Sequence, residues 1–511
     1  MTVPALHYGS TAGRWVVAAT VLGSGIAAID ATVVGIALPA IGKDFDVGVS
    51  SLQWVVNAYT LTLAGLLLLG GALGDQFGRR RLFLVGTIWF ALASLLCGFA
   101  PNATVLVLAR ALQGVGGALL TPGSLAILQA SFVQSDRSKA IGAWSGLGGV
   151  ATAIGPFLGG WLISAVSWRL VFFINLPIAA VVVAIAARHV PESATPEAGG
   201  VDGSGGAVIT AALVGLTYGL IEGPTRGWTS PAVTVSLAAS VLLVLVFLYV
   251  EGRRRSPLLP LAIFQSRQFT ATNAVTFLVY AALGGVLFLL PVVLQEVSGY
   301  SPLVAGSALL PVTAIMLLLS ARSGALAARI GPRLQLSVGP LVIAAGLVLL
   351  VRVDRGGYAA HVLPAMAVFG LGLAITVAPL TSTVLAAAPE DHSGIASAVN
   401  NDVARTGGLI AVAVLPAAAG ITGVTFGHAD ALAHGFHNAA VIAAAACVVA
   451  AGLAAVAIRN PTRTERRALH AHDEERHCSL DAPPLRGEHH CQSADNTSAA
   501  ARSPERTAPS M

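Results

Sequence analysis

The stretch Gly71-Ala-Leu-Gly-Asp-Gln-Phe-Gly-Arg-Arg-Arg81 decides the fold, because its pattern recurs as Gly324-Ala-Leu-Ala-Ala-Arg-Ile-Gly-Pro-Arg333. Both copies open with Gly-Ala-Leu and close with a glycine that is followed two positions later by an arginine. Each copy also follows the second long apolar run of a block of six, provided that two runs between the blocks are an insertion. The repeat therefore predicts a chain made of two equivalent halves.

The chain around these loops is too apolar for a water-soluble protein. Of its 511 residues, 55% are hydrophobic and only 10% are charged, whereas a soluble domain carries about 25% charged residues. Lipid is therefore the expected solvent for most of the chain. The net charge of +5 is spread between apolar segments, which indicates membrane orientation and a lipid bilayer partner rather than nucleic acid.

About fourteen apolar segments are long enough to span a membrane, since a helix needs about 20 apolar residues to cross a core of about 30 Å. The sequence thus predicts an all-α polytopic membrane protein with two six-helix bundles and two extra transmembrane helices between them. The predicted spans are 15–38, 52–73, 82–99, 104–127, 141–164, 169–187, 206–222, 232–250, 270–295, 303–325, 335–352, 360–387, 395–418 and 437–458.

The domain boundaries follow from these spans. We expect a cytoplasmic N-terminus at 1–14, an N-terminal six-helix bundle at 15–187 and a C-terminal six-helix bundle at 268–458. Residues 188–267 hold cytoplasmic linkers and the two extra transmembrane helices. Residues 459–511 are polar and rich in Pro, Ser and His, which predicts a disordered cytoplasmic tail.

Basic residues at the span ends orient the chain, because short cytoplasmic loops carry an excess of lysine and arginine. With a cytoplasmic N-terminus, the inner side receives Arg14, Arg79, Arg80, Arg81, Arg137, Lys139, Arg188, Arg253, Arg254, Arg255, Arg267, Arg322, Arg329, Arg333, Arg459, Arg463, Arg466 and Arg467. The outer side receives Lys43, Arg169, Arg226, Arg352 and Arg355. This bias predicts a multi-pass protein of the inner (cytoplasmic) membrane with both termini in the cytoplasm.

Polar and glycine-rich motifs interrupt the apolar spans. They are Ile29-Asp30-Ala-Thr32-Val-Val-Gly35-Ile-Ala37-Leu38-Pro39, Trp54-Val-Val-Asn57-Ala-Tyr59, Leu108-Ala-Arg110-Ala-Leu-Gln113-Gly114-Val-Gly116-Gly117, Gly155-Pro156-Phe-Leu-Gly159-Gly160, Trp168-Arg169-Leu-Val-Phe-Phe173-Ile-Asn175-Leu-Pro177, Gln295-Glu-Val-Ser-Gly299-Tyr-Ser301-Pro302 and Gly394-Ile-Ala-Ser397-Ala-Val-Asn400-Asn401-Asp402-Val-Ala-Arg405. With the loop after the second span, these motifs resemble the major facilitator superfamily, specifically its fourteen-span drug:proton antiporter branch of multidrug and antibiotic efflux proteins. The resemblance runs from Ile29 to Arg405.

Asp30 and Arg110 are expected at similar depths in the membrane. Asp30 lies about 16 residues into the first span, roughly 24 Å from the inner edge at 1.5 Å per residue. Arg110 lies about six residues into the inward-running fourth span, roughly 9 Å below the outer edge of a core of about 30 Å. The two charges can therefore meet. We interpret them as proton-coupling residues, with a fixed structural ion pair as the alternative.

The resemblance implies a conformational latch in the loop after the second span. Asp75 can bond Arg79 and can face the positively polarised N-terminal end of the thirteenth span near Ser393 and Gly394. The alternative is that the arginines only anchor topology, and Gln76 departs from the basic residue common at this place. The predicted latch consists of Gly71, Asp75, Gly78, Arg79 and Arg80.

The fifth span matches the antiporter motif of exporters in this superfamily. Its residues are Gly155, Pro156, Gly159 and Gly160. Proline removes a backbone donor, and we expect the glycines to let a helix of the other half pack closely. The predicted substrate cavity contains Thr32, Asn57, Tyr59, Gln113, Asn400 and Asn401, although Asn57 and Tyr59 could equally make bonds between helices.

Asp402 and Arg405 add a second charged pair, in the thirteenth span. Their spacing of three residues lets them neutralise each other on one helix face, which is one interpretation. The alternative is a second titrating or cation-recognising site, so both residues are also candidates for proton coupling.

The sequence contains no phosphate-binding Gly-Lys-Ser/Thr loop, so we expect no cofactor and energy from a proton gradient. The His and Cys residues of the tail fit no zinc spacing well, and we expect no metal site and no enzymatic activity. The sequence thus predicts a secondary active transporter that exports small organic molecules, such as amphipathic or cationic drugs or antibiotics, in exchange for protons and as a monomer. The alternative is a metabolite symporter or uniporter of the same superfamily.

Overall fold

The computed structural model describes residues 6–194, 203–254, 259–353, 357–388, 393–423 and 428–460. The chain divides into two units, Met1–Asn460 and Pro461–Met511. The second unit contains nearly all of the predicted tail and lies outside the described residues. In the described ranges the only β contact is an isolated bridge between Leu6 and Phe132, and every other regular element is helical.

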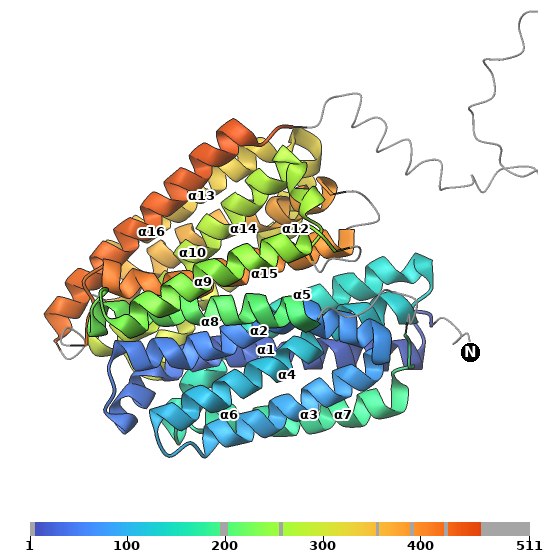
Figure 1. Cartoon of the computed structure of the whole chain (residues 1–511), viewed down its shortest axis with the longest axis horizontal. Helices are drawn as coiled ribbons and strands as arrows, with labels where there is room; N and C mark the ends of the chain where they lie inside the picture. Colours follow the sequence, from blue (N-terminus) through green and yellow to red (C-terminus); the bar gives the residue numbers. More distant parts are fainter. Residues whose placement is uncertain are drawn as a thin grey trace, which may run out of the picture. The chain divides into compact units, whose positions relative to one another are not determined.

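The helices fall into two sets of six, each broken helix counted once, with two helices between the sets (Figure 1). The first set comprises α1 (Thr11–Phe45), α2 (Val49–Phe77), α3 (Arg79–Gly98), α4 (Ala103–Ser131), α5 (Gln134–Ala165) and the broken span α6 (Leu170–Phe173) with α7 (Asn175–His189). The intervening helices are α8 (Gly203–Arg226) and α9 (Pro231–Glu251). The second set comprises α10 (Arg267–Glu296), the broken span α11 (Pro302–Ser307) with α12 (Leu310–Ile330), α13 (Pro332–Leu349), α14 (Leu363–Ala386), α15 (Ser393–Ala418) and α16 (Ala429–Ala457).

Thirteen helical segments in the described ranges are long and apolar enough to cross a membrane. The helix α15 is 26 residues long but is not among the thirteen, and its first half carries the polar residues Asn401, Asp402 and Arg405. The all-helical polytopic fold is confirmed, while the count of fourteen spans stays a prediction.

The two sets repeat one packing scheme, which confirms the internal repeat. In the first set α2 and α3 both pack on α4, α1 packs on α5, and α7 packs on α1 and α3. In the second set α12 and α13 both pack on α14, α10 packs on α15, and α16 packs on α10 and α13. Each helix of one half thus has a counterpart with the same neighbours in the other half. The helices α8 and α9 pack on each other, and α8 also contacts α2 and α15.

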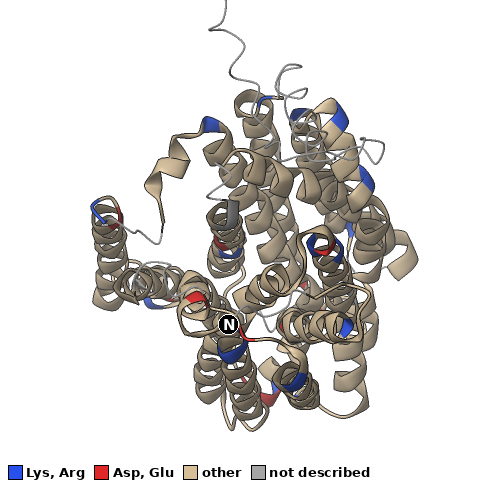
Figure 2. Ribbon diagram, turned by 90° about the vertical axis from the view of Figure 1, so that its right-hand side faces the viewer, with Lys and Arg blue, Asp and Glu red and all other residues tan. Residues whose placement is uncertain are grey.

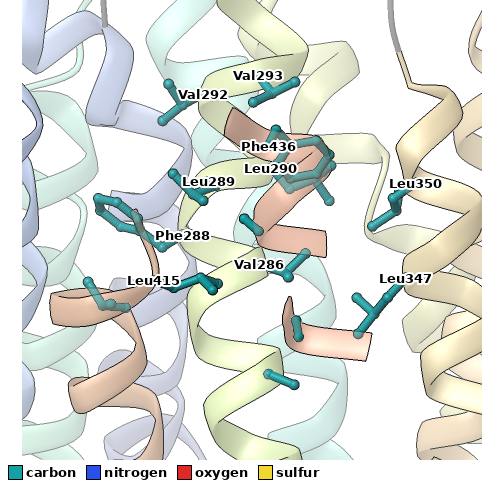
Figure 3. Packing of buried hydrophobic residues seen from close by; sticks show 14 of the residues in the cluster. Val286, Phe288, Leu289, Leu290, Val292, Val293, Leu347, Leu350, Leu415 and Phe436 are labelled. Atoms are coloured by element: carbon teal, nitrogen blue, oxygen red, sulfur yellow. The ribbon is translucent and has the colours of Figure 1, made fainter. Parts of the chain in front are cut away.

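Burial differs sharply between helices, as expected where lipid is the solvent. The helix α10 is apolar on several faces and packs through Val286, Leu290 and Val293, close to Leu347 of α13 and Phe436 of α16 (Figure 3). The helix α9 instead exposes a row of large apolar side chains, namely Val235, Val241, Leu242, Leu245 and Tyr249. Such a surface is stable against lipid tails but not against water. Figure 2 shows charged residues as short stretches on otherwise uncharged helices.

Polar contacts join the two halves at the end of the helices that the positive-inside bias places outside. Lys43 Nζ and Glu296 Oε1 lie 2.8 Å apart, and Gln295 Nε2 donates to the Ile36 carbonyl at 3.0 Å. At the opposite end, where the N-terminus lies, the two sets of helices diverge in Figure 1.

A proline creates a further contact between the halves. Pro416 lies inside α15 and has no N–H, so the carbonyl of Val412, four residues earlier, lacks its helical donor. Gln53 Nε2 of α2 donates to that carbonyl at 2.6 Å and to the Ala413 carbonyl at 3.1 Å. Pro416 in α15 thus leaves free the carbonyl to which Gln53 of α2 donates.

Candidate functional site

Asp30 and Arg110 form a fully buried ion pair inside the N-terminal half. Asp30 lies on α1 and is 0% exposed, and Arg110 lies on α4 and is 1% exposed. Arg110 Nη1 donates to Asp30 Oδ2 at 2.5 Å. Gln113 Nε2, one turn along α4, donates to Asp30 Oδ1 at 2.9 Å. The depth argument from the sequence predicted that these charges can meet, and the structure brings them together.

Asn175 completes the surroundings of the Asp30 carboxylate and was not among the predicted site residues. Its Nδ2 donates to Asp30 Oδ1 at 3.1 Å and to Ser94 Oγ at 3.0 Å. Asn175 opens α7, directly after the break at Ile174. A polar side chain in the otherwise apolar run from Leu170 was the available sequence signal. The Asp30 carboxylate therefore accepts hydrogen bonds from three side chains, those of Arg110, Gln113 and Asn175.

Arg110 makes further contacts besides the one with Asp30. Its Nε donates to the Val55 carbonyl at 3.1 Å, and its Nη1 also donates to Gln113 Oε1 at 2.7 Å. The guanidinium carbon lies 4.3 Å from the centre of the Tyr59 ring, a cation–π distance. Removing one member of such a buried pair strands the other charge and costs about 3–5 kcal/mol.

Of the predicted cavity residues of α2, Asn57 contacts the other half, whereas Tyr59 packs inside the N-terminal half. Asn57 is 0% exposed, and its Nδ2 donates to the Leu409 carbonyl of α15 at 3.3 Å. Tyr59 is 3% exposed, and its hydroxyl lies buried without a hydrogen-bond partner, as does Asn57 Oδ1. Gln113 belongs to the Asp30 cluster instead.

The other predicted cavity residues are dispersed. Thr32 Oγ1 donates to the Ala28 and Ile29 carbonyls of its own helix. Asn400 Nδ2 donates to Asn273 Oδ1 at 3.1 Å and to Thr276 Oγ1 at 2.9 Å, both on α10. Asn401 is exposed and bonds the Ser397 carbonyl at 3.0 Å. The structure does not bring the six residues into one group, because helical rotation points neighbours such as Asn400 and Asn401 in different directions.

Asp402 and Arg405 do not form the ion pair that their spacing allows. Within the part of the chain that the structure describes, no hydrogen bond or ion pair joins either side chain to another residue, and Asp402 Oδ1 is buried without a partner. The two side chains thus make no direct ion pair, while self-neutralisation through the charge of Arg405 stays a prediction. A spacing of three residues permits contact but does not enforce it.

The antiporter motif presents two faces. A side-chain carbon at Gly160 would overlap the Pro302 carbonyl of α11, and one at Gly306 of α11 would overlap the Pro156 carbonyl, so Pro156 and Gly160 form the close approach between the halves. A carbon at Gly155 would instead meet Thr32, and one at Gly159 would meet Val33 at 2.6 Å, both on α1 of the same half. The expectation that all three glycines face the other half is wrong, because helical periodicity groups Gly155 with Gly159 and Pro156 with Gly160.

The contacts that the structure shows for the predicted latch all lie within the N-terminal half. Arg79 Nε donates to Asp75 Oδ1 at 2.8 Å. Gly71 lies against Pro122 of α4, where an added side-chain carbon would meet Pro122 Cβ at 3.6 Å. The side chains of Ser393 and Gly394 lie outside the described residues, so the contact between Asp75 and that end of α15 stays a prediction.

Glu192 caps the same loop and was missed at the sequence level. Gly78 joins α2 to α3 at φ +110°, a conformation that favours glycine. Glu192, beyond α7, accepts from the Arg80 N–H through Oε1 at 3.0 Å and from the Arg81 N–H through Oε2 at 3.2 Å. Arg80 Nη1 also donates to the Val190 carbonyl at 3.2 Å. A carboxylate at a helix N-terminus is stabilised by the unpaired N–H groups there.

The second half repeats this cap with a neutral residue. Gly331 joins α12 to α13 at φ +90°. Asn460, beyond α16, accepts from the Arg333 N–H through Oδ1 at 3.0 Å. Arg333 Nε donates to the Ala455 carbonyl at 2.9 Å. The sequence repeat at Gly71 and Gly324 thus corresponds to a structural repeat.

Comparison with known proteins agrees with this architecture. The family model for the Major Facilitator Superfamily matches residues 20–413. The chain belongs to the major facilitator superfamily. It is therefore a multi-pass membrane protein of a family of transporters, whose members work on small molecules in a lipid bilayer.

Curated relatives in the major facilitator superfamily cover most of the chain. The multidrug resistance protein Stp of Mycobacterium tuberculosis is 35% identical over 78% of this chain and 74% of its own length. The tetracenomycin C resistance and export protein of Streptomyces glaucescens is 36% identical over 78% of this chain and 74% of its own length. The puromycin resistance protein pur8 of Streptomyces alboniger is 36% identical over 85% of this chain and 89% of its own length.

Solved structures of other transporters share the fold at low identity. A bacterial homolog of the human lysosomal transporter Spinster, in an inward-facing and unoccupied conformation, has a TM-score of 0.63 at 16% identity and covers 88% of this chain and 98% of its own. The peptide transporter POT in complex with sulfate has a TM-score of 0.65 at 13% identity, covering 89% and 98%.

Proposed function

We propose that this chain exports small organic molecules, namely drugs or antibiotics, in exchange for protons by alternating access. The relatives that support export are multidrug and antibiotic resistance proteins, one of which is named an export protein. The chain would work in the inner membrane as a monomer with both termini in the cytoplasm. It would need no cofactor, and the proton gradient would supply the energy.

The observation that carries proton coupling is the buried carboxylate of Asp30. A mid-membrane carboxylate is expensive, and its cost here is offset by Arg110, Gln113 and Asn175. If Asp30 binds a proton, its bond to Arg110 loses its ionic character, so the guanidinium is released. Protonation and the packing of α1 against α4 are thereby coupled.

The present contacts fit one step of the cycle. The halves meet through Gln53, Gln295 and Glu296 at the outer end, and Asp30 is held as a carboxylate. This corresponds to a state that is open to the cytoplasm after proton release. Opening of the outer end would let water reach Asp30, and an external proton would then bind while substrate leaves.

Transport into everted membrane vesicles tests the proposal. Uptake of ethidium and of puromycin is measured with a proton gradient and again with an uncoupler. We expect gradient-dependent uptake by the wild type and its loss in Asp30→Asn, with folding checked by size-exclusion chromatography. Uptake that the uncoupler leaves unchanged would reject proton exchange. Movement of substrate in the direction of the protons would favour the symporter alternative.

A further inference from the structure

The two mid-membrane arginines have opposite surroundings. Arg110 bonds Asp30, Gln113 and the Val55 carbonyl and stacks on Tyr59. Arg405 is half-buried, and among the described residues it has no hydrogen-bond or ion-pair partner. The five donors of a half-buried guanidinium need acceptors, because an unpaired charge in a low-dielectric region is costly.

The position of Arg405 follows from the register of α2 against α15. Gln53 contacts the carbonyls of Val412 and Ala413, and Asn57 contacts the carbonyl of Leu409. Arg405 lies one turn farther along the same face of α15. It therefore occupies the first turn beyond the last hydrogen bond between α2 and α15, on the side where the halves diverge.

Two tyrosines and one acid lie within reach of the Arg405 charge. Tyr59 of α2 and Tyr280 of α10 lie close enough to Arg405 for its charge to act on both. Within the described ranges the Tyr59 hydroxyl has no hydrogen-bond partner. Asp402, one turn away, makes no ion pair with Arg405. Because Tyr59 is buried against Arg110, the half-buried Tyr280 is the ring available to a flat molecule that carries one negative group at Arg405.

We infer that Arg405 is an anion subsite that binds a carboxylate, phenolate or similar acidic group of an aromatic substrate entering between the halves. A guanidinium binds such groups through two parallel hydrogen bonds, and the Tyr280 ring covers the flat face of the molecule. This inference rests on the proposed export function and extends its substrate class from cationic compounds to acidic and zwitterionic ones.

A pair of dyes that differ in one acidic group tests the subsite. Tetramethylrhodamine carries a free carboxylate, and its methyl ester does not. Binding of each dye to the purified full chain in lipid nanodiscs is measured by fluorescence anisotropy near neutral pH. We expect the wild type to bind the acid roughly tenfold tighter than the ester.

Variants test whether Arg405 causes the preference for the acid over the ester. Arg405→Gln should remove the preference, and Arg405→Lys should keep part of it, because ammonium retains the charge but not the paired hydrogen bonds. The folded chain should tolerate both, since Arg405 makes no bond that they would break. Arg322→Gln, at an exposed arginine of α12, removes the same charge and should leave the preference intact.

Equal affinities of the wild type for acid and ester would overturn the inference, as would a preference that survives in Arg405→Gln. Binding does not depend on a proton gradient, so this test is separate from the test of proton exchange. Acid-selective binding without gradient-driven transport would reject the proposed function and support the subsite. Gradient-driven transport of both dyes, together with equal binding affinities, would support the proposed function and reject the subsite.

Discussion

Glu192 Oε1 accepts a hydrogen bond from the backbone N–H of Arg80 at 3.0 Å, so the segment that leaves α7 caps the start of α3. This contact ties the sixth span of the N-terminal half to the loop after its second span. It also fixes the arginines that the resemblance assigns to a latch.

Glu192→Ala should lower the stability of the N-terminal half by about 1 kcal/mol, because the first N–H groups of α3 lose their acceptor. The apparent unfolding temperature of the purified protein measures this change. Glu192→Gln keeps a neutral acceptor, as Asn460 does in the other half, and should recover most of the loss. Glu192→Ala with an unchanged unfolding temperature would show that the cap contributes no stability.

Gly78→Ala should destabilise the chain by about 2 kcal/mol, since φ of +110° is unfavourable for a residue with a side chain. A carbon at Gly78 would also come within 2.7 Å of Glu192 Oε1, so the cap would have to move. Gly146→Ala is the matched control, because a carbon there meets no atom within 4 Å. Gly78→Ala should unfold at a lower temperature than Gly146→Ala. Equal unfolding temperatures would contradict the prediction.

Gln53→Leu should weaken closure of the outer end, because the carbonyl that Pro416 leaves free loses its donor and stays buried at a cost of about 1–3 kcal/mol. Cysteines at Gly48 and Gly423 report on this end, since a carbon at Gly48 lies 3.6 Å from the Gly423 Cα. We expect fast disulfide formation in the otherwise wild-type chain and slower formation with Gln53→Leu.

Thr60→Val is the control for that experiment, because the Thr60 hydroxyl bonds only the Val56 carbonyl of its own helix. Cross-linking should proceed at the wild-type rate in this variant. If Gln53→Leu also cross-links at that rate, the Gln53 contact does not hold the halves together.

Asp30→Asn and Arg110→Gln should each destabilise the chain by about 3 kcal/mol, since each leaves a buried charge without its partner. The double variant removes both charges and should recover most of the stability, as measured by thermal unfolding, while transport stays lost. A double variant as unstable as the sum of the single ones would show that the two side chains stabilise the fold independently.

The two halves and the Asp30–Arg110 contact could be predicted from sequence, because both follow from periodicity and depth. Span lengths set how deep Asp30 and Arg110 lie, and equal depth in a small bundle nearly imposes contact. The capping role of Glu192 could not be predicted, since no local sequence signal shows that an acidic residue after one span contacts the start of another. The unpaired state of Arg405 was missed for a related reason: spacing on one helix says which contacts are possible, whereas neighbouring helices decide which form.

Substrate-driven proton flux tests the central claim, that Asp30 carries the exchanged proton, most directly. The purified chain is reconstituted into liposomes with a proton gradient and an internal pH dye, and ethidium or puromycin is added. We expect substrate to dissipate the gradient with wild type and with Asp30→Glu, but not with folded Asp30→Asn. An equal substrate-driven proton flux through Asp30→Asn would contradict the account.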